Sequence, residues 1–337
     1  MSKNDAQNIY LCHTYYHLYM ALVLSYTDYL EGTESVVVVS FNKNIYDSAF
    51  FERLKEVSWA EILDLTDQET VKRLDNTAAW KKIWLNIFLT KLYPRLNPAV
   101  EKLPVLHNAK LFLFNDFHYL ARYIMKKSRA EVDIIEDGNM NYTPIKDGIS
   151  TFLKKLVGVY PSYGRHPHIK KIMVQEPEKL PDDVKAKGVC LNFHEKLNNM
   201  PDSVKQELVE LFLGGQAFEF GESSVLVLTQ PYYDFGRVSY ERHKQVYSEI
   251  VNTLTSKGFN VIIKPHPSDS VDYAKLFPSV EILSAGFPIE ILNQTCQQKI
   301  KFAVGVNTTA VNNIRFSEEN INLLPYYKNI KDGYENT

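Results

Sequence analysis

Short runs of β-branched and apolar residues recur along the chain, and most of them are apolar at every position. The "VVVV" within residues 35–40 and the "VII" within residues 260–267 are two examples. Strands without polar alternation are typical of parallel sheets that helices cover on both faces. A longer segment with helical periodicity follows most of these runs, so the sequence predicts an α/β fold.

The strand–helix alternation occurs twice. Strands are expected at residues 8–12, 35–40, 110–116 and 131–138 in the first half, and at 223–230, 260–267, 280–283 and 301–307 in the second. Helices are expected at residues 15–30, 117–127, 238–257 and 288–298, and from Thr309 onward. Two such series predict two doubly wound, Rossmann-like domains, at residues 1–200 and 215–337. The connection is expected within the proline-containing stretch 160–222, with the domain boundary near residues 190–222.

Length, charge and cysteine content narrow the class of protein. The chain has 337 residues, which suits two domains at roughly 150 residues each. Its formal net charge of -2 gives no indication of nucleic-acid binding. Three scattered cysteines, Cys12, Cys190 and Cys296, argue against a disulfide framework or a zinc site and favour a reducing compartment. No segment resembles a signal peptide or reaches the ~18 apolar residues that span a bilayer, so we expect a soluble, cytoplasmic protein.

The segment "WKKIWLNIFLTKLYPRL" carries apolar residues at helical spacing. They are Trp80, Ile83, Trp84, Ile87, Phe88 and Leu92, and they are flanked by Lys81, Lys82 and Lys91. The pattern favours a helix packed in the core or against a second copy of the chain in a homodimer. The alternative is a helix that lies on the inner membrane face and makes the protein a peripheral membrane protein.

Polar residues follow four of the predicted strands. In open α/β sheets, ligands bind beyond the carboxyl ends of the strands, so these residues are candidates for a site. The candidates are Glu136, Asp137 and Gly138; Thr229 and Gln230; Lys264, Pro265, His266 and Pro267; and Asn307, Thr308 and Thr309. We expect them to converge on one cleft between the two domains.

His266 lies between two prolines directly after a predicted strand. Pro265 and Pro267 fix the backbone φ angle on each side, which would hold the imidazole in place. A rigid histidine there can donate a proton or a hydrogen bond to a phosphate. Judged alone, the His-Pro pair favours the alternative, a turn histidine that caps backbone groups. A second pair, His166-Pro167, follows no strand-like run, and we interpret it as a solvated loop that could lie close to an anionic ligand.

Asp137 and Glu136 follow the apolar residues 132–135. Adjacent side chains in an extended chain point to opposite sides, so only one carboxylate is expected to face a cleft. Gly138 allows a sharp turn or the close approach of a substrate. Such a carboxylate could accept a proton from an attacking hydroxyl, while a histidine of the other domain serves the leaving group. The alternative is a solvated acid pair or a helix cap.

Two further pairs of residues, one of threonines and one of histidines, are candidates for ligand sites. The hydroxyls of Thr308 and Thr309 and the free N–H groups of the helix they begin could bind an anion, although an ordinary threonine N-cap is an equal interpretation. His13 and His17 lie four residues apart, as two metal ligands on one helix would, but no third ligand has suitable spacing. We therefore expect both histidines in the core or facing a cleft, and no metal site. No dinucleotide-binding or Walker motif is present, which argues against dinucleotide- and ATP-dependent enzymes.

Taken in order, these motifs resemble those of the bacterial sialyltransferases of glycosyltransferase family 52. The order is acid-Asp-Gly at 136–138, "KPHP" at 264–267, "PIEIL" at 288–292 and a hydroxyl pair at 308–309. The resemblance covers residues 8–315. It implies the GT-B fold, in which two Rossmann-like domains face each other. It also implies inverting transfer from CMP-sialic acid to a glycan, with no metal and no other cofactor.

The resemblance implies roles for individual residues. Asp137 would be the general base that deprotonates the acceptor hydroxyl, and His266 would donate to the phosphate of the departing CMP. Thr308 and Thr309 would bind that phosphate. Glu290, within "PIEIL", would hold the ribose hydroxyls of CMP, although it could also be an acid on a helix surface.

The last motif departs from the family pattern, and this leaves the donor sugar open. Thr308 stands where the family usually has serine, and its added methyl could change the fit. Thr229 and Gln230 would line the nucleotide pocket. The expected acceptor is a terminal galactose of a surface glycan such as lipooligosaccharide or capsule. The alternatives are a transferase that uses another nonulosonate or a nucleotide-hexose, and a catalytically silent protein that binds nucleotide sugars.

Overall fold

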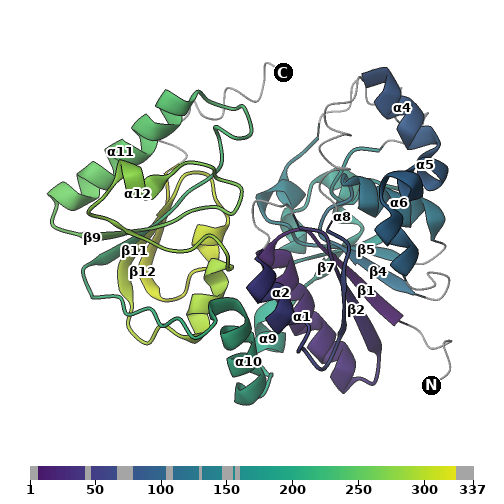
Figure 1. Ribbon diagram of the computed structural model, residues 1–337, viewed down its shortest axis with the longest axis horizontal. Coiled ribbons are helices and arrows are strands. Elements are labelled where there is room, and N and C mark those ends of the chain that lie inside the picture. The colour runs from purple at the N-terminus through teal and green to yellow at the C-terminus, as the bar shows by residue number, and fades with distance from the viewer. Residues whose placement is uncertain are drawn as a thin grey trace. The chain divides into compact units, whose positions relative to one another are not determined.

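The computed structural model describes residues 7–41, 47–66, 79–103, 109–128, 131–145, 155 and 160–323. It divides the chain into two compact units, Met1–Pro201 and Asp202–Thr337 (Figure 1). Each unit is built on its own parallel β-sheet with helices packed on it. The α/β class predicted from the sequence is therefore confirmed.

The described strands of the first unit form a parallel sheet in the order β3-β2-β1-β4-β5-β6-β7. They are β1 (Gln7–Cys12), β2 (Glu34–Val39), β3 (Glu61–Asp64), β4 (Lys110–Leu113), β5 (Val132–Ile135), β6 (Ile169–Val174) and β7 (Gly188–Cys190). The chain proceeds from β1 through β2 to β3 and then returns to place β4 on the other side of β1. The strand order reverses between β1 and β4, and open α/β sheets bind ligands at such a reversal.

Helices connect these strands. They are α1 (Tyr15–Leu30), α2 (Ser48–Leu54), α4 (Ala79–Ile87), α5 (Leu89–Leu96), α6 (Tyr119–Lys127), α8 (Asp182–Lys185) and α9 (Phe193–Asn198), with the short 3-10 helices η2 (Pro98–Lys102), η3 (Asn139–Tyr142) and η4 (Pro177–Lys179). Helix α1 begins where the side chain of Thr14 accepts the N–H of His17, a common N-cap arrangement. It is buried along most of its length because it packs against β1, β2 and α9.

Both faces of the first sheet are buried, as the continuous apolar runs predict. Alternate residues of three neighbouring strands share one core: Ile9 and Leu11, Val36 and Val38, and Leu111 and Leu113. On the opposite face, the ring of Tyr10 stacks on Phe112 with centroids 4.7 Å apart. This packing on both faces holds the central strands in place, and with them the residues that follow β1 and β4.

Residues 160–200 complete the first sheet, although the sequence indicated a connection that begins at residue 160. Strand β6 pairs with β5, and β7 pairs with β6. The pattern of "IKKIMV" concealed β6, because Lys170 and Lys171 are exposed within the strand and interrupt its apolar run. Helix α10 (Asp202–Leu213) follows at once and packs on the 3-10 helix η5 (Ile289–Gln294) of the second unit.

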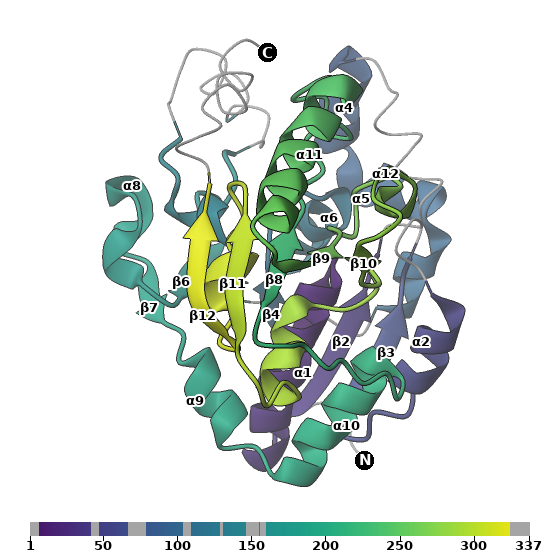
Figure 2. The ribbon, with the colours of Figure 1, turned by 90° about the vertical axis from the view of Figure 1, so that its left-hand side faces the viewer.

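The second unit has a smaller parallel sheet in the order β10-β9-β8-β11-β12 (Figure 2). Its described strands are β8 (Ser224–Leu228), β9 (Asn260–Lys264), β10 (Glu281–Ile282), β11 (Ile300–Gly305) and β12 (Ser317–Asn322). The long helix α11 (Tyr240–Ser256) and the short α12 (Tyr273–Leu276) follow β8 and β9. The order reverses between β8 and β11, so this unit has a ligand-binding edge of the same kind.

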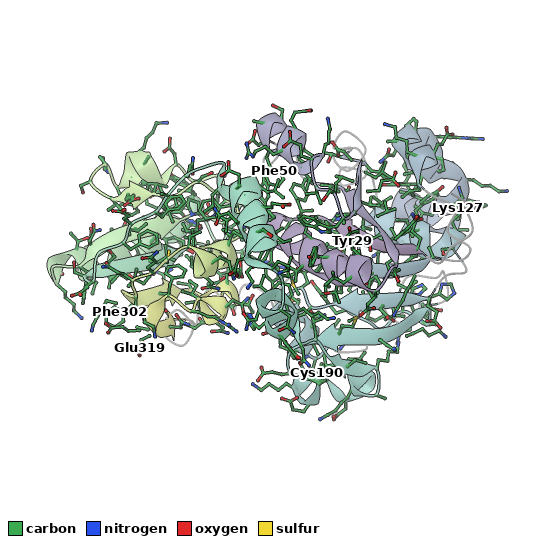
Figure 3. The ribbon with its side chains drawn as sticks, turned by 90° about the horizontal axis from the view of Figure 1, so that it is seen from below. Tyr29, Phe50, Lys127, Cys190, Phe302 and Glu319 are labelled. Carbon is green, nitrogen blue, oxygen red and sulfur yellow. The ribbon has the colours of Figure 1, made fainter. Side chains whose placement is uncertain are left out.

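Two helices expected in the second unit are shorter than predicted. The segment 288–298 forms only the 3-10 helix η5, and the helix expected from Thr309 onward is the single turn η6 (Ala310–Asn313). Strand β12 follows this turn and pairs with β11, with Phe302 opposite Glu319 (Figure 3). The prediction missed β12 because "SEENIN" is polar, as an edge strand can be.

The segment with the repeated apolar residues forms α4 and α5, which are interrupted at Phe88. Leu85 and Leu89 face the core, whereas Trp84, Ile87 and Phe88 are 55%, 44% and 40% exposed. The core interpretation is therefore wrong for these three residues within this chain; Trp80 and Ile83 lie outside the described side chains. Among the described residues, no helix combines the length and apolar character needed to cross a bilayer.

Candidate active site

In the first unit, polar side chains gather at the carboxyl ends of β1, β4 and β5. His13 follows β1, His118 follows β4 and Asp137 follows β5. Since β4 lies between β1 and β5, these three strand ends are neighbours at the point where the strand order reverses. The position is the one at which such sheets bind ligands.

Asp137 is held by one hydrogen bond of its backbone and one of its side chain. Its N–H donates to Oδ1 of Asn141 at 2.8 Å, and its Oδ1 lies 2.6 Å from Nε2 of His17. Gly138 follows with φ 93° and ψ −153°, a conformation that favours glycine. The carboxylate remains 23% exposed. One oxygen is thus held by His17, and the side chain still reaches the surface.

Glu136 is buried, whereas the neighbouring Asp137 is partly exposed. It accepts the N–H of Gln175 at 2.6 Å and the hydroxyl of Tyr142 at 3.0 Å. Burial raises the pKa of the Glu136 carboxyl above its usual value. The Glu136 side chain thus connects the end of β5 to the segment that follows β6.

His17 was not recognised from the sequence as the partner of Asp137. Its Nδ1 accepts the N–H of His13 at 3.2 Å, so the neutral ring carries its hydrogen on Nε2 and donates it to Asp137. The ring also stacks on Phe114, with centroids 4.3 Å apart and planes at 4°. His17 is almost fully buried, which leaves the imidazole one orientation.

His118 is a second residue that the sequence reasoning missed. Its ring stacks on His13 with centroids 4.1 Å apart. Burial, and then the nearby His17, lower the pKa of His118 to about 4, while Asp137 opposes the shift. His118 is therefore neutral at pH 7 beside Asp137. Its position just after a central strand could have indicated from the sequence that it lies at the candidate site.

In the second unit, Thr229 organises the loop that carries His266. The Thr229 hydroxyl accepts the N–H of His266 at 3.0 Å and donates to Oδ2 of Asp269 at 2.6 Å. Asp269, which the sequence reasoning did not single out, also accepts the hydroxyl of Tyr273 at 2.7 Å. The hydroxyl of Thr229 is thus engaged in shaping the loop. The N–H of Gln230 donates to the Tyr247 hydroxyl at 2.7 Å.

His266 is half-buried between the half-buried Pro265 and Pro267. Its Nδ1 accepts the N–H of Ser268 at 3.0 Å. The neutral ring therefore carries its hydrogen on Nε2, which makes that nitrogen a donor. This tautomer is the one that a hydrogen bond to a phosphate requires.

Lys264 and Glu290 are both buried, and they attract each other electrostatically. The Lys264 ammonium lies 4.5 Å from the centroid of the Phe287 ring, and Glu290 accepts from Nδ2 of Asn313 at 3.1 Å. Burial lowers the pKa of Lys264 to about 7 and raises that of Glu290, and the attraction between the two opposes both shifts. Glu290 is therefore a buried acid and not the helix-surface acid weighed above.

The turn after β11 differs from the predicted helix start. Asn307 has the left-handed φ of 49°, and its N–H donates to Oδ1 of Asn322 at 2.9 Å. The η6 turn is too short to supply the free N–H groups of a helix end, which corrects that part of the prediction. Within the described part of the chain, no hydrogen bond engages the hydroxyl of Thr308 or Thr309.

The methyl group of buried Thr308 packs over Gly305. A Cβ at position 305 would clash with Cγ2 of Thr308, while the next atoms, Cβ of Thr308 and Cβ of Val311, lie 3.6 and 3.7 Å away. The Tyr232 hydroxyl donates to the carbonyl of Val306 at 2.9 Å and joins the loop after β8 to this turn. The structure thus places the candidates of the second unit at the carboxyl edge of its sheet and beside it.

Metal ligation has no support in the described side chains. Among them, no group of three or more histidine, cysteine, aspartate or glutamate residues is arranged to hold a metal ion. The N–H of His13 donates to Nδ1 of His17, and Nε2 of His17 bonds to Asp137.

The fold is that of the GT-B glycosyltransferases. The chain is similar to the α/β-galactoside α-2,3-sialyltransferase of Photobacterium phosphoreum, with a TM-score of 0.53, 10% identity, and coverage of 94% of this chain and 90% of that one. A sialyltransferase from Photobacterium damselae gives a TM-score of 0.49 at 12% identity, with the same coverage. The first of these two likenesses confirms the predicted GT-B fold.

Sequence comparison identifies the family. The sequence model of glycosyltransferase family 52 matches residues 79–326, which is most of the chain. An uncharacterized protein of Haemophilus influenzae (strain ATCC 51907 / DSM 11121 / KW20 / Rd) is 26% identical over 180 residues, which are 52% of this chain and 56% of that protein. The chain thus matches a little over half the length of that relative. This protein belongs to glycosyltransferase family 52.

Proposed function

We propose that the protein is a sialyltransferase that transfers sialic acid from CMP-sialic acid, with inversion, to a hydroxyl group of a surface glycan. Family membership and a fold shared with a galactoside sialyltransferase support this assignment. The observation that carries it is the pairing of the partly exposed Asp137 with His17 at the ligand-binding edge of the first sheet. The acceptor we propose is a terminal galactose of lipooligosaccharide or capsule.

Asp137 acts as the general base. One oxygen is occupied by the hydrogen bond from His17, which leaves the other to accept the proton of the attacking hydroxyl. The anomeric carbon of sialic acid is tertiary, so its transition state has oxocarbenium character and a base of modest strength suffices. The side-chain oxygen of Asn141 accepts the N–H of Asp137 and so fixes the angle at which the carboxylate meets the acceptor hydroxyl.

His266 acts on the leaving group. Its Nε2–H donates to the phosphate of CMP, and the charge that develops there is stabilised by the hydroxyls of Thr308 and Thr309. Preorganised donors in a partly buried site can replace a divalent cation, so we propose that the reaction needs no metal and continues in the presence of a chelator.

The remaining candidates bind the nucleotide. Glu290 accepts the ribose hydroxyls, and Lys264 keeps that buried carboxylate compensated. The pocket around the cytosine of CMP is lined by Gln230, by Asn307 and by the backbone of the 264–267 loop. Gly138 lets the acceptor approach Asp137 closely.

Replacement of Asp137 by asparagine tests the proposal. We expect Asp137→Asn to lower kcat by about 10⁴-fold or more, because a base contributes on the order of 10²–10⁴ and the amide also alters the bond to His17. CMP affinity should stay within about twofold, measured by calorimetry. The control is Glu178→Gln, an exposed acid of the same unit. Activity that persists in Asp137→Asn contradicts the role of the base.

The donor is tested separately. CMP release from CMP-sialic acid, compared with release from other nonulosonate and nucleotide-hexose donors, identifies the sugar. A protein that binds CMP but neither hydrolyses nor transfers any donor would be a nucleotide-sugar-binding protein on the same fold.

We also propose that the protein works at the cytoplasmic face of the inner membrane. Trp84, Ile87 and Phe88 form an exposed apolar patch, with the exposed Lys81 and Lys91 nearby in the sequence. The rings of Trp84 and Phe88 stack with centroids 5.6 Å apart. An apolar surface flanked by lysines suits the boundary of an anionic bilayer, although a second copy of the chain could also cover it.

A further inference from the structure

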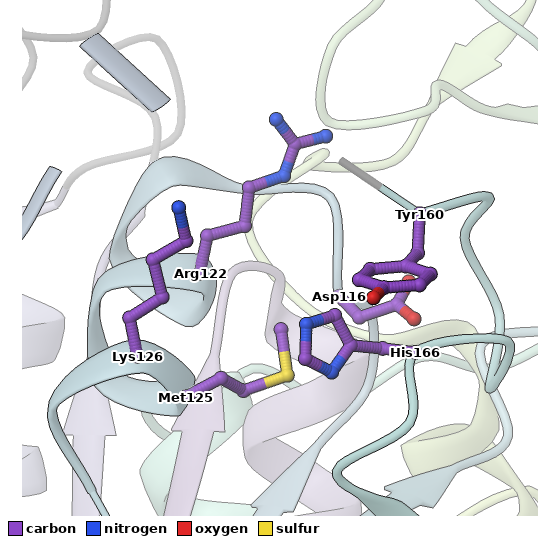
Figure 4. Close-up of a pocket in the computed structure, with 6 residues that line it drawn as sticks. All are labelled: Asp116, Arg122, Met125, Lys126, Tyr160 and His166. Atoms are coloured by element: carbon purple, nitrogen blue, oxygen red, sulfur yellow. The ribbon is translucent and has the colours of Figure 1, made fainter. Parts of the chain in front are cut away.

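A small pocket in the first unit lies between α6 and the loop that leads into β6 (Figure 4). Its lining residues are Asp116, Arg122, Met125, Lys126, Tyr160 and His166. The space among these side chains is small and opens to solvent. It is far smaller than the roughly 300–1,000 Å³ of pockets that hold whole small-molecule ligands, so only a single small group at its mouth suits it.

Two cations of the pocket are anchored on one residue. Arg122 donates from Nη1 to the side-chain oxygen of Asn86 at 3.2 Å, and Lys126 donates from Nζ to the carbonyl oxygen of Asn86. Burial and the nearby Arg122 charge lower the pKa of Lys126. Their other N–H groups make no hydrogen bond within the described residues. Two positively charged side chains are therefore held close together, and their remaining N–H groups can bind a ligand.

His166 adds an uncharged donor to the same pocket. Its Nδ1 accepts the N–H of His168 at 3.2 Å, so the neutral ring carries its hydrogen on Nε2. Burial, followed by the charges of His168 and Lys126, lowers the pKa of His166 to about 4. The ring of Tyr160 contacts His166 edge-on at 4.8 Å and brings its hydroxyl to the pocket. The loop is thus ordered and half-buried, and not the solvated loop expected from the sequence.

Asp116 is the one carboxylate among the lining residues, and its oxygens are already engaged. They accept the N–H groups of Tyr163 at 2.7 Å and Gly164 at 3.2 Å. These two residues have φ angles of 59° and 93°, and successive N–H groups in such a turn form a cradle for an anion. Asp116 therefore shapes the loop, and only one negative charge faces the charges of Arg122 and Lys126.

The pocket lies near the candidate base. His118 interacts electrostatically with both Asp137 and Arg122. Phe117 is 38% exposed, and its ring lies 4.6 Å from that of His118 and 5.9 Å from that of Tyr163, centroid to centroid. An exposed aromatic ring thus connects the surroundings of Asp137 with the loop of the pocket.

We infer that this pocket binds a small oxyanion, a phosphate or a carboxylate, that is carried by the acceptor glycan. A guanidinium, an ammonium and neutral N–H and O–H donors are the groups that recognise such an anion. The anion site stands independently of the proposed function, whereas its assignment to the acceptor rests on that function.

Inorganic phosphate and acetate are the probes for the site itself. We expect phosphate or acetate to shift the imidazole NMR signal of His166 saturably in the full chain, and to raise the pKa of His166 from about 4, because an anion stabilises the charged ring. Lys126→Gln should weaken this binding by about 10-fold, the loss of one charge-assisted hydrogen bond. The control, Lys127→Gln, removes the next charge of α6, which bonds to the Tyr123 hydroxyl, and should change nothing. Equal binding by both variants, or none by the parent chain, overturns the site.

Acceptor kinetics test the assignment. Lys126→Gln should raise KM for a phosphorylated or sialylated galactoside by about 10-fold and leave KM for the neutral galactoside and CMP release from donor alone unchanged. The two acceptors distinguish phosphate from carboxylate. A uniform change across all acceptors contradicts the assignment. Phosphate binding without any glycosyl transfer by the parent chain would leave the site standing and defeat the proposed function instead. Matched urea midpoints exclude a folding effect, since Lys126 also bonds to α4.

Discussion

The two sheet edges hold their candidate catalytic side chains in different ways. In the first unit, Asp137 is oriented by His17, a residue 120 positions away that stacks on Phe114. In the second, His266 is fixed by the N–H of Ser268, two residues further on, between two prolines. The first arrangement depends on how α1 packs on the sheet, whereas the second is contained in one loop. The geometry at Asp137 should therefore be the more sensitive of the two to changes elsewhere in the fold.

After Asp137→Asn, replacement of His266 has the largest effect expected from this comparison. His266→Ala removes the donor to the leaving phosphate, and we expect kcat to fall by about 10²–10⁴-fold and CMP binding to weaken together. Rates of transfer and calorimetric CMP titration measure the two quantities. His194→Ala in α9 is the control. An unchanged rate would refute the leaving-group role.

Replacement of His17 addresses the remote partner. His17→Leu should lower kcat by about 10²-fold and leave KM for the donor unchanged, because a misplaced base costs rate and not donor binding. His17→Gln can still donate to Asp137 and should recover part of the loss. The pH profile of kcat should also move in the leucine variant. Equal activity of the two variants would mean that His17 only fills space.

Acid should weaken the first unit through its histidines. The pKa of His118 is about 4 in the folded chain and about 6.5 when unfolded, so the unfolded state binds more protons between these values. This contribution to stability is present above pH 6.5 and is lost as the pH falls toward 4, by about 2 kcal/mol at pH 5 for His118. Urea unfolding followed by tryptophan fluorescence reports on this unit, since Trp59, Trp80 and Trp84 all belong to it. His118→Gln should flatten the dependence; a slope that persists would assign it to other groups.

The exposed patch predicts the smallest effect on the isolated protein. Trp84→Ser should leave activity on soluble acceptors within about twofold, because the side chain is 55% exposed and distant in sequence from the candidate site. Flotation with vesicles that contain anionic lipid should fall several-fold. Unchanged flotation, together with a loss of dimer by light scattering, would instead assign the patch to a homodimer.

The sequence predicted the parts of the molecule that depend on local patterns. Continuous apolar runs indicated most strands, and the strand exits indicated Asp137 and His266. The pairing of His17 with Asp137 could not be predicted, because it depends on the order β1-β4-β5 in space. Strands β6 and β12 were missed because lysines or polar residues occupy them. The loop at His166 was misjudged because its order comes from Asp116, 47 and 48 positions from the residues that it binds.

The contact between Thr308 and Gly305 has a consequence for variation in the family. A side chain at 305 collides with the methyl of Thr308, whereas the other neighbours leave ordinary room. Serine in place of Thr308 would relieve that collision, so alanine at 305 is compatible with serine but not with threonine. The two positions should therefore change in concert during evolution, and threonine in this motif requires glycine at the last residue of β11.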